Sequence, residues 1–239
     1  LRVNVRRTDA PAARAMLVSD GVQTEPHPDV PGALVVTAGA PRIAASAAYR
    51  DGLVELQDAA SQAAVLRLPL RDGMRVLDYC AGGGGKSLAM GGRADLTLFA
   101  HDAEPRRMAD LPVRAARAGL RVETLKSEGA RGAGPFDLVL VDAPCSGSGT
   151  WRRTPEAKWT LTETRLAGYA ALQARIVAEA APLVAPGGCL GYATCSILAE
   201  ENRAGVDMAG WDGWTLEDRL DLLPDDKHDG FHLAILTRR

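Results

Sequence analysis

The chain has 239 residues, enough for a full α/β core with a small appended unit, so we expect one main domain. Hydrophobic residues make up 46% of it and charged residues 24%, which is ordinary for a globular protein. The net charge of −2 and the 5% of aromatic residues exclude a chain that binds nucleic acid over most of its surface, because such proteins carry an excess of Lys and Arg. Any nucleic-acid contact must be local.

The four cysteines form neither a metal motif nor a disulfide framework. There is no CxxC pair and no His at a zinc-ligand spacing, so we expect free thiols and no metal ion. No apolar run approaches the roughly 20 residues that cross a bilayer, and no signal peptide is visible. We therefore expect a cytoplasmic, monomeric protein without a membrane partner. Because the first residue is Leu1 rather than Met, we expect further residues upstream.

The first part of the chain, residues 1–48, is predicted to be a small α+β subdomain. Residues 49–239 are predicted to form the main domain, which opens with a helix before the turn at Arg71-Asp72-Gly73. The hydrophobic pattern of this region predicts strands over 2–6 and 33–38, and helices over 9–19 and 52–70.

From residue 75 onward, strand and helix patterns alternate. Strands are predicted over 75–79, 96–101, 121–125, 136–141, 189–194 and 231–237, and helices after the first strand and over 104–118 and 162–184. Such alternation is typical of an α/β fold with a mostly parallel, doubly wound Rossmann-like sheet. Ligands of such sheets bind at the carboxyl ends of the strands.

A glycine-rich turn follows the first strand of this sheet, where backbone amides can approach a ligand closely. A P-loop would need Gly in place of Cys80, and a dinucleotide fingerprint would need Gly in place of Ser87. Asp102 ends the second strand, where an acid accepts hydrogen bonds from a ribose. The alternative is that the glycines only make a sharp turn in the chain. Buried carboxylates at the ends of successive strands cost free energy unless they have a partner, which favours a cofactor site. The predicted contacts of an adenosine-containing cofactor are Cys80, Ala81, Gly82, Gly83, Gly84, Gly85, Lys86, Asp102, Glu128 and Asp142.

Two cysteines follow neighbouring strands, Cys145 after Asp142-Ala143-Pro144 and Cys195 after Ala193-Thr194. We expect both thiols in one pocket. A thiolate that adds to C6 of a cytosine makes C5 nucleophilic enough to accept a methyl group from a sulfonium. A helix expected near Ser196 would favour the Cys195 thiolate, and Asp142 would hydrogen-bond the base. Cys80 and Cys189 are expected to be buried small hydrophobes.

With these residues the chain resembles the Sun/RsmB family of bacterial RNA (cytosine-5) methyltransferases, over nearly its whole length. The resemblance implies a class I methyltransferase that uses S-adenosylmethionine, with Cys195 attacking the base and Cys145 assisting release. DNA cytosine methyltransferases attack with the Pro-Cys thiol instead, so the two dipeptides together favour RNA. The shared segments are the glycine turn, Arg2-Val3-Asn4, Gln57-Asp58-Ala59-Ala60-Ser61-Gln62, Asp142-Ala143-Pro144-Cys145-Ser146-Gly147, Arg152-Arg153-Thr154-Pro155-Glu156-Ala157-Lys158-Trp159, Ala193-Thr194-Cys195-Ser196, Glu200-Glu201-Asn202 and Asp229-Gly230-Phe231.

The resemblance also indicates how RNA is held. Arg152, Arg153 and Lys158 follow the Cys145 segment and are predicted to contact phosphates, while a helical RNA-binding domain often precedes this part of family members. Two departures, Gly83 where the family usually has Pro and Glu128 where it usually has Asp, predict weaker cofactor binding.

Ribosomal RNA is the expected substrate, and three alternatives stand beside this interpretation. Transfer RNA is the nearest, because the sequence contains no readable base code. A catalytically weak RNA-binding or ribosome-assembly module would fit the Gly83 departure but not the intact Cys145, Cys195 and Asp142. A small-molecule methyltransferase would leave the paired thiols unexplained.

Overall fold

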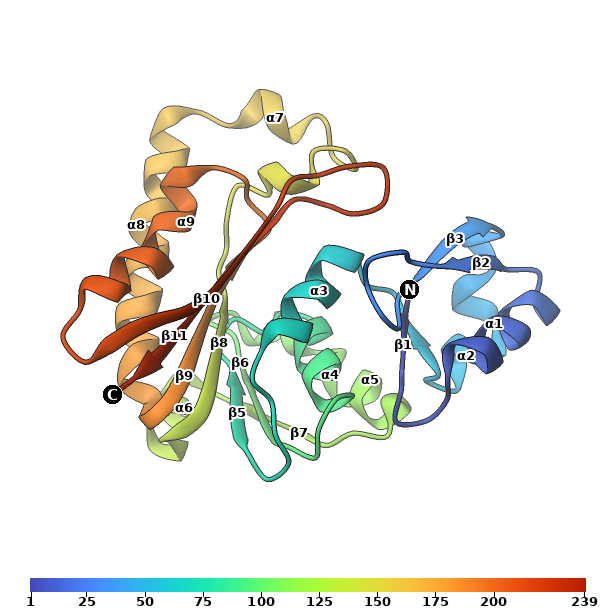
Figure 1. Cartoon of the computed structure of the whole chain (residues 1–239), viewed down its shortest axis with the longest axis horizontal. Coiled ribbons are helices and arrows are strands. Elements are labelled where there is room, and N and C mark those ends of the chain that lie inside the picture. Colours follow the sequence, from blue (N-terminus) through green and yellow to red (C-terminus); the bar gives the residue numbers. More distant parts are fainter.

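Two bodies of unequal size lie side by side in Figure 1, where the chain is coloured from blue at the N-terminus to red at the C-terminus. The computed structural model describes the backbone of residues 1–239 and every side chain except that of residue 209. The larger body is a twisted sheet with α8 and α9 on one face and α3, α4 and α5 on the other (Figure 1). The smaller body is built from N-terminal residues.

The sheet of the larger body has seven strands in the order β10-β11-β9-β8-β5-β6-β7. The neighbouring pairs β9-β8, β8-β5, β5-β6 and β6-β7 are parallel, and β11 is antiparallel to both β9 and β10. The predicted mostly parallel, doubly wound α/β sheet is therefore confirmed. The strands are β5 Arg75–Asp78, β6 Thr97–His101, β7 Val122–Leu125, β8 Phe136–Asp142, β9 Val184–Thr194, β10 Trp214–Leu222 and β11 Phe231–Arg238.

Two layers of helices bury the faces of this sheet. Along β8, Val139 and Val141 point into the cluster with α8, whereas Leu138 and Leu140 point into the cluster with α3 and α4. Alternate residues of a strand face opposite ways, so a strand buried on both faces is apolar almost throughout. The α-helices of the larger body are α3 Ala59–Arg67, α4 Gly85–Gly91, α5 Leu111–Ala118, α6 Ser127–Ala133, α7 Ala157–Thr160, α8 Glu163–Ala180 and α9 Ala199–Asp207.

The N-terminal body has its own buried cluster, which includes Leu17, Leu34 and Val54. Because β4 pairs with β1 although it lies beyond residue 48, we propose that this subdomain extends through Glu55. Its elements are β1 Arg2–Val3, α1 Ala10–Ser19, β2 Gln23–Pro26, β3 Leu34–Ala38, α2 Ala47–Arg50 and β4 Val54–Glu55.

Several predicted element boundaries were wrong for local reasons. The helix expected over 52–70 begins only at Ala59, capped by the Asp58 carboxylate, because the preceding residues pair with β1 instead. The helix expected over 104–118 is a 3₁₀ helix followed by α5, since Pro112 has no N–H and starts a new helix. The strands β2 and β10 were not predicted. Within the part of the chain that the structure describes, none of the helices is long and apolar enough to cross a membrane.

The double burial of β8 gives a stability prediction. Leu140 is 1% exposed, so Leu140→Ala removes apolar contacts and leaves a cavity, and we expect a loss of about 2–5 kcal/mol in the free energy of unfolding. Urea denaturation followed by circular dichroism measures this loss. The matched control Leu223→Ala changes a side chain that is 73% exposed and should cost less than about 0.5 kcal/mol. Equal losses in the two variants would contradict this packing.

Candidate active site

Two thiols meet where β8 and β9 end. The strands are parallel neighbours in which Asp142 pairs with Ala193, so the segments that follow them leave the sheet at the same edge. Cys145 Sγ and Cys195 Sγ lie 3.4 Å apart, within hydrogen-bonding distance for sulfur. The Gly149 amide also donates to the Cys195 carbonyl at 2.9 Å. Both thiols are partly buried, at the position the sequence predicted for them.

The two thiols differ in their affinity for a proton. The hydrogen bond from Cys145 lowers the pKa of Cys195 most; burial and Asp142 oppose this effect, and Lys86 assists it. The same hydrogen bond and burial raise the pKa of Cys145. When one of the two thiols ionises, Cys195 therefore loses its proton more readily than Cys145. The helix expected near Ser196 is present but begins three residues later, at Ala199, so Cys195 does not lie at its first turn and its ionisation is favoured by Cys145 and Lys86 instead.

Lys86 is buried beside the thiols. Its ammonium lies 2.6 Å from Asp142 Oδ2 and 5.0 Å from the centre of the Phe231 ring, and the side chain is 12% exposed. Burial lowers the pKa of Lys86, but the attraction and hydrogen bond of Asp142 outweigh burial and raise it overall. Lys86 was predicted as a cofactor contact, and the structure brings it together with Asp142 and the thiols. It supplies the positive charge of this site.

The glycine turn is fixed by contacts that only glycine permits. Gly84 has φ +79°, and a Cβ there would lie 2.1 Å from Leu111 Cδ1. The Gly82 amide donates to Asp102 Oδ2 at 2.9 Å, which ties the turn to the end of β6. Arg114 donates to the Gly83 carbonyl. Because the partner of Arg114 is a backbone atom far away along the chain, the sequence alone does not reveal this contact.

A cavity opens beside this turn, between the ends of β5, β6 and β8 and the start of α6. Asp102, 4% exposed, lies at this cavity and accepts backbone hydrogen bonds from Gly82 and Glu104. Glu128, a predicted contact, is exposed to solvent, whereas its neighbour Ser127 lines the cavity. The other lining residues include Tyr79, Cys80, His101, Ala103, Arg107 and Pro144.

His101 was missed by the sequence analysis although it directly precedes Asp102. Its Nδ1 lies 2.7 Å from the Tyr79 carbonyl, which makes this nitrogen the donor, and its Nε2 accepts from the Ser127 hydroxyl at 3.0 Å. The ring therefore connects β5, β6 and the start of α6 at the cavity wall. Its position at the end of a strand was the signal in the sequence.

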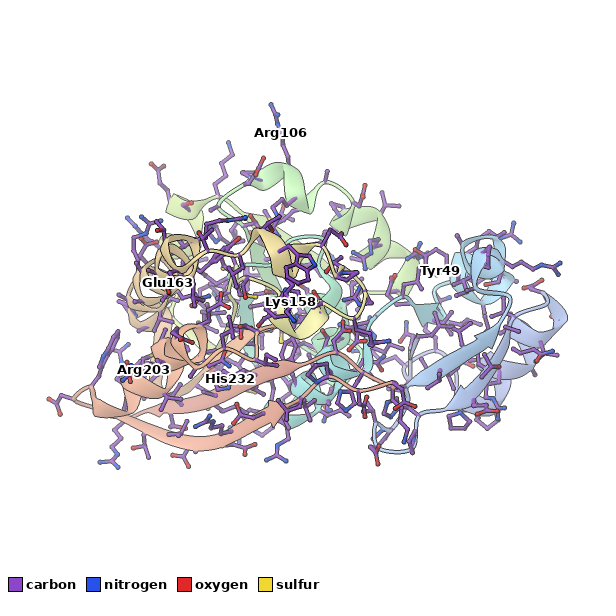
Figure 2. All side chains as sticks on the ribbon, turned by 90° about the horizontal axis from the view of Figure 1, so that it is seen from above. Tyr49, Arg106, Lys158, Glu163, Arg203 and His232 are labelled. Atoms are coloured by element: carbon purple, nitrogen blue, oxygen red, sulfur yellow. The ribbon has the colours of Figure 1, made fainter. Side chains whose placement is uncertain are left out.

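The basic residues after Cys145 are paired within the protein. Arg153 lies 2.5 Å and Arg152 3.1 Å from the carboxylate of Asp229, which is almost fully buried. Lys158 lies on α7, toward the centre of the top view in Figure 2, with its ammonium 5.7 Å from the Trp159 ring. Arg106, in contrast, projects into solvent (Figure 2). Among the side chains that the structure describes, no group of three or more His, Cys, Asp or Glu residues is placed to hold a metal ion.

Asp78 makes the stability of the protein depend on pH. It is 1% exposed, Ser87 donates to its Oδ2 at 2.6 Å, and burial raises its pKa from 3.8 to about 7. The folded state thus binds this proton more tightly than the unfolded state, and its stabilising effect is lost as the pH rises through about 7. Asp78→Asn, which cannot ionise, should flatten the fall in unfolding free energy between about pH 4 and 7, measured with urea. Asp226→Asn, an exposed control, should not, and equal slopes in Asp78→Asn and the parent would refute the assignment.

The Lys86 charge gives a second prediction. Without this ammonium, Asp142 loses its partner beside Cys195, so Lys86→Gln should move the pH midpoint of Cys195 alkylation upward. Iodoacetamide labelling from pH 6 to 10, with the Cys195 peptide quantified by mass spectrometry, measures this midpoint. Lys126→Gln removes an exposed charge and serves as the control. A midpoint in Lys86→Gln that is unchanged or lower would contradict the charge assignment.

Solved structures share this architecture. The crystal structure of PH0851 superimposes with a TM-score of 0.88 at 29% identity, covering 98% of this chain and 58% of that one. NSun6 from Pyrococcus horikoshii, solved with SFG, gives a TM-score of 0.84 at 16% identity, covering 99% of this chain and 89% of that one. At that identity the likeness establishes the fold alone, which is the Rossmann-like fold of methyltransferases.

Comparison of sequences identifies the family. The ribosomal RNA small subunit methyltransferase B of Salmonella newport (strain SL254) is 36% identical over 211 residues, 85% of this chain and 48% of that protein. The chain thus spans about half the length of the curated relatives it matches. The family model for 16S rRNA methyltransferase RsmB/F matches residues 65–219, a range that holds the glycine turn and both thiols. The chain belongs to the RsmB/F family of 16S rRNA methyltransferases.

Proposed function

We propose that this chain transfers a methyl group from S-adenosylmethionine to C5 of a cytosine in ribosomal RNA, through a covalent bond between Cys195 and C6. The observation that carries the proposal is the pair of thiols 3.4 Å apart, with Lys86 and Asp142 beside Cys195, whose pKa is lowered by the hydrogen bond from Cys145. The family of the chain and the names of its relatives support RNA as the substrate. The cytoplasm, which keeps thiols reduced, is the proposed compartment.

The cavity beside the glycine turn suits S-adenosylmethionine. A buried carboxylate, Asp102, lies where a ribose would be held, and Tyr79 and Cys80 offer an aromatic and an apolar surface. We propose Ser127 as a contact in place of Glu128, which faces solvent. A neighbouring structure solved with SFG, an analogue of this cofactor, supports the assignment. When bound, the cofactor supplies an electrophilic methyl group.

The reaction begins at Cys195. Its thiolate adds to C6 of the cytosine, which makes C5 an enamine carbon able to form the new bond to the methyl group. Asp142 accepts a hydrogen bond from the N4 amino group and so orients the base, and the Lys86 ammonium beside it offsets the negative charge that develops on the ring. Lys86 keeps Asp142 oriented through the contact of 2.6 Å.

Release uses Cys145. Once Cys195 is bonded to carbon it carries no charge, so the main cause that holds the proton on Cys145 is removed, and Cys145 loses that proton to solvent. The Cys145 thiolate then takes the C5 proton while the bond between Cys195 and C6 breaks. Cys195 leaves as a thiolate and Cys145 is again a thiol, which restores the starting state. One methyl group enters and one proton leaves in each cycle.

RNA contact is proposed for the surface that carries α7. Trp159 is 82% exposed there, and Lys158 lies next to it, so a base can stack while the ammonium meets a phosphate. Arg152 and Arg153 stay in the proposal as phosphate contacts, but both already pair with Asp229, and Arg152 also lies 3.8 Å from Asp58. RNA would therefore compete with an internal ion pair at these two arginines.

The first test is methylation itself. The protein, labelled S-adenosylmethionine, and either ribosomal or transfer RNA are incubated, and 5-methylcytosine is measured in the digested RNA. Labelled 5-methylcytosine in ribosomal RNA supports the proposal. Label in transfer RNA alone would show that transfer RNA, and not ribosomal RNA, is the substrate. Absence of methylation in both, with cofactor bound, would favour the RNA-binding module instead.

The division of labour between the thiols gives a separate prediction. Cys145→Ala should accumulate a covalent protein–RNA adduct, because the release step fails after the bond to C6 forms. Cys195→Ala should form none. Denaturing gel electrophoresis with labelled RNA detects the adduct, and Cys189→Ala, which alters a thiol beside Thr237, is the control. An adduct in Cys195→Ala and none in Cys145→Ala would exchange the two roles.

A further inference from the structure

Glu201 is a buried carboxylate with no role in the steps described above. It lies in the first turn of α9 and is 0% exposed. Its Oε1 accepts from the Ser146 amide at 2.7 Å and from Gln173 Nε2 at 3.2 Å. Its Oε2 accepts from the hydroxyls of Ser146 and Ser196, each at 2.5 Å. Four donors thus surround one carboxylate.

Two of these donors belong to residues that directly follow the reactive thiols. Ser146 follows Cys145, and Ser196 follows Cys195, so Glu201 is hydrogen-bonded to both cysteine segments at once. Gln173 from α8 reaches the same carboxylate and also donates to the Pro144 carbonyl at 3.0 Å, just before Cys145. The carboxylate is therefore the common anchor of the two segments.

The chemistry of a buried carboxylate makes this anchor strong. An ionised carboxylate away from water is tolerated only when its oxygens are saturated with hydrogen bonds, and bonds to a charged acceptor are about twice as strong as neutral ones. If either serine moved away, Glu201 would lose donors it cannot replace from solvent. The hydrogen bonds to Glu201 thus hold both cysteine segments in place.

We propose that Glu201 is a positioning residue that holds the Cys145 and Cys195 segments together and so sets the contact between the two thiols. The proposal deepens the proposed function and rests on it for its catalytic meaning. The contact itself is a property of the protein without RNA. The negative charge of Glu201 additionally raises the pKa of Cys145, which keeps the proton on that thiol.

The charged groups that face Cys195 are Lys86 from α4, Asp142 from β8 and Arg153 from the segment after Cys145. None of them changes in a Glu201 variant. Loss of a nearby negative charge alone would make thiols easier to ionise. Loss of the hydrogen bond from Cys145 would instead make Cys195 harder to ionise, so the direction of the change separates positioning from a simple charge effect.

The test uses Glu201→Gln in the full chain without RNA, with iodoacetamide labelling of Cys195 followed by mass spectrometry across pH. We expect the midpoint to rise by about one pH unit, so that labelling below the midpoint is roughly tenfold slower. The matched control Glu200→Gln removes an exposed charge from the adjacent residue and should leave the midpoint unchanged. A midpoint that is unchanged or lower in folded Glu201→Gln overturns the proposal.

Two milder variants keep the proposal testable if Glu201→Gln does not fold. Ser146→Ala and Ser196→Ala each remove one hydroxyl donor from Glu201 and keep its charge, and each should raise the Cys195 midpoint by a smaller amount. If neither variant raises the Cys195 midpoint, the proposal is overturned. The alkylation readout needs neither RNA nor methylation. If the variants shift the Cys195 midpoint but the unaltered protein transfers no methyl group to RNA, the proposed function is contradicted and the positioning role stands.

Discussion

The parallel pairing of β8 with β9 is the constraint on which the site depends. Because Asp142 and Ala193 are partners in the sheet, the segments that follow must run side by side, and a contact of 3.4 Å between the sulfur atoms becomes possible. Backbone hydrogen bonds extend this pairing beyond the strands, from Ala143 to Ala193 and from Gly149 to Cys195. The reactive groups therefore lie on segments whose backbones are hydrogen-bonded to one another, which preorganises them.

Each buried polar or charged group at this edge of the sheet has a partner. Lys86 lies against Asp142, the thiols of Cys145 and Cys195 are hydrogen-bonded to each other, and Glu201 is saturated by neutral donors. Such a site is costly to assemble, since each group loses hydration on burial. In return, each group is oriented before a substrate arrives, and the charge on one thiol depends on the protonation of the other. Ionisation, addition and release are thereby linked through one contact.

The sequence could predict the order of strands and helices because hydrophobic periodicity is strong in this chain. It also indicated that Cys145 and Cys195 share a pocket, since residues at the ends of neighbouring parallel strands converge. It could not indicate which nearby groups set their protonation. Lys86 lies in a glycine turn far away along the chain, and only the packed fold shows that its ammonium reaches Asp142 rather than the surface.

Other parts of the site escaped prediction for similar reasons. The helix α9 begins at Ala199 rather than at Ser196, whose hydroxyl instead donates to Glu201 within the helix. Arg152 and Arg153 were predicted to be free for RNA, but their partner Asp229 follows a distant turn between β10 and β11. Charge clusters in a sequence do not reveal the acids that the fold places against them. The proposed roles of the two thiols come from the family resemblance and from the opposite directions of their pKa shifts.

The most direct measurement uses the unaltered protein with S-adenosylmethionine and RNA that contains 5-fluorocytosine. Fluorine at C5 prevents loss of a proton there, so the protein that attacks C6 stays bonded to the base. Digestion and mass spectrometry then identify the bonded residue. The account predicts a nucleotide on Cys195, with Cys145 unmodified. A nucleotide on Cys145, or cofactor-bound protein that methylates ordinary cytosine without any bond to the fluorinated base, would contradict it.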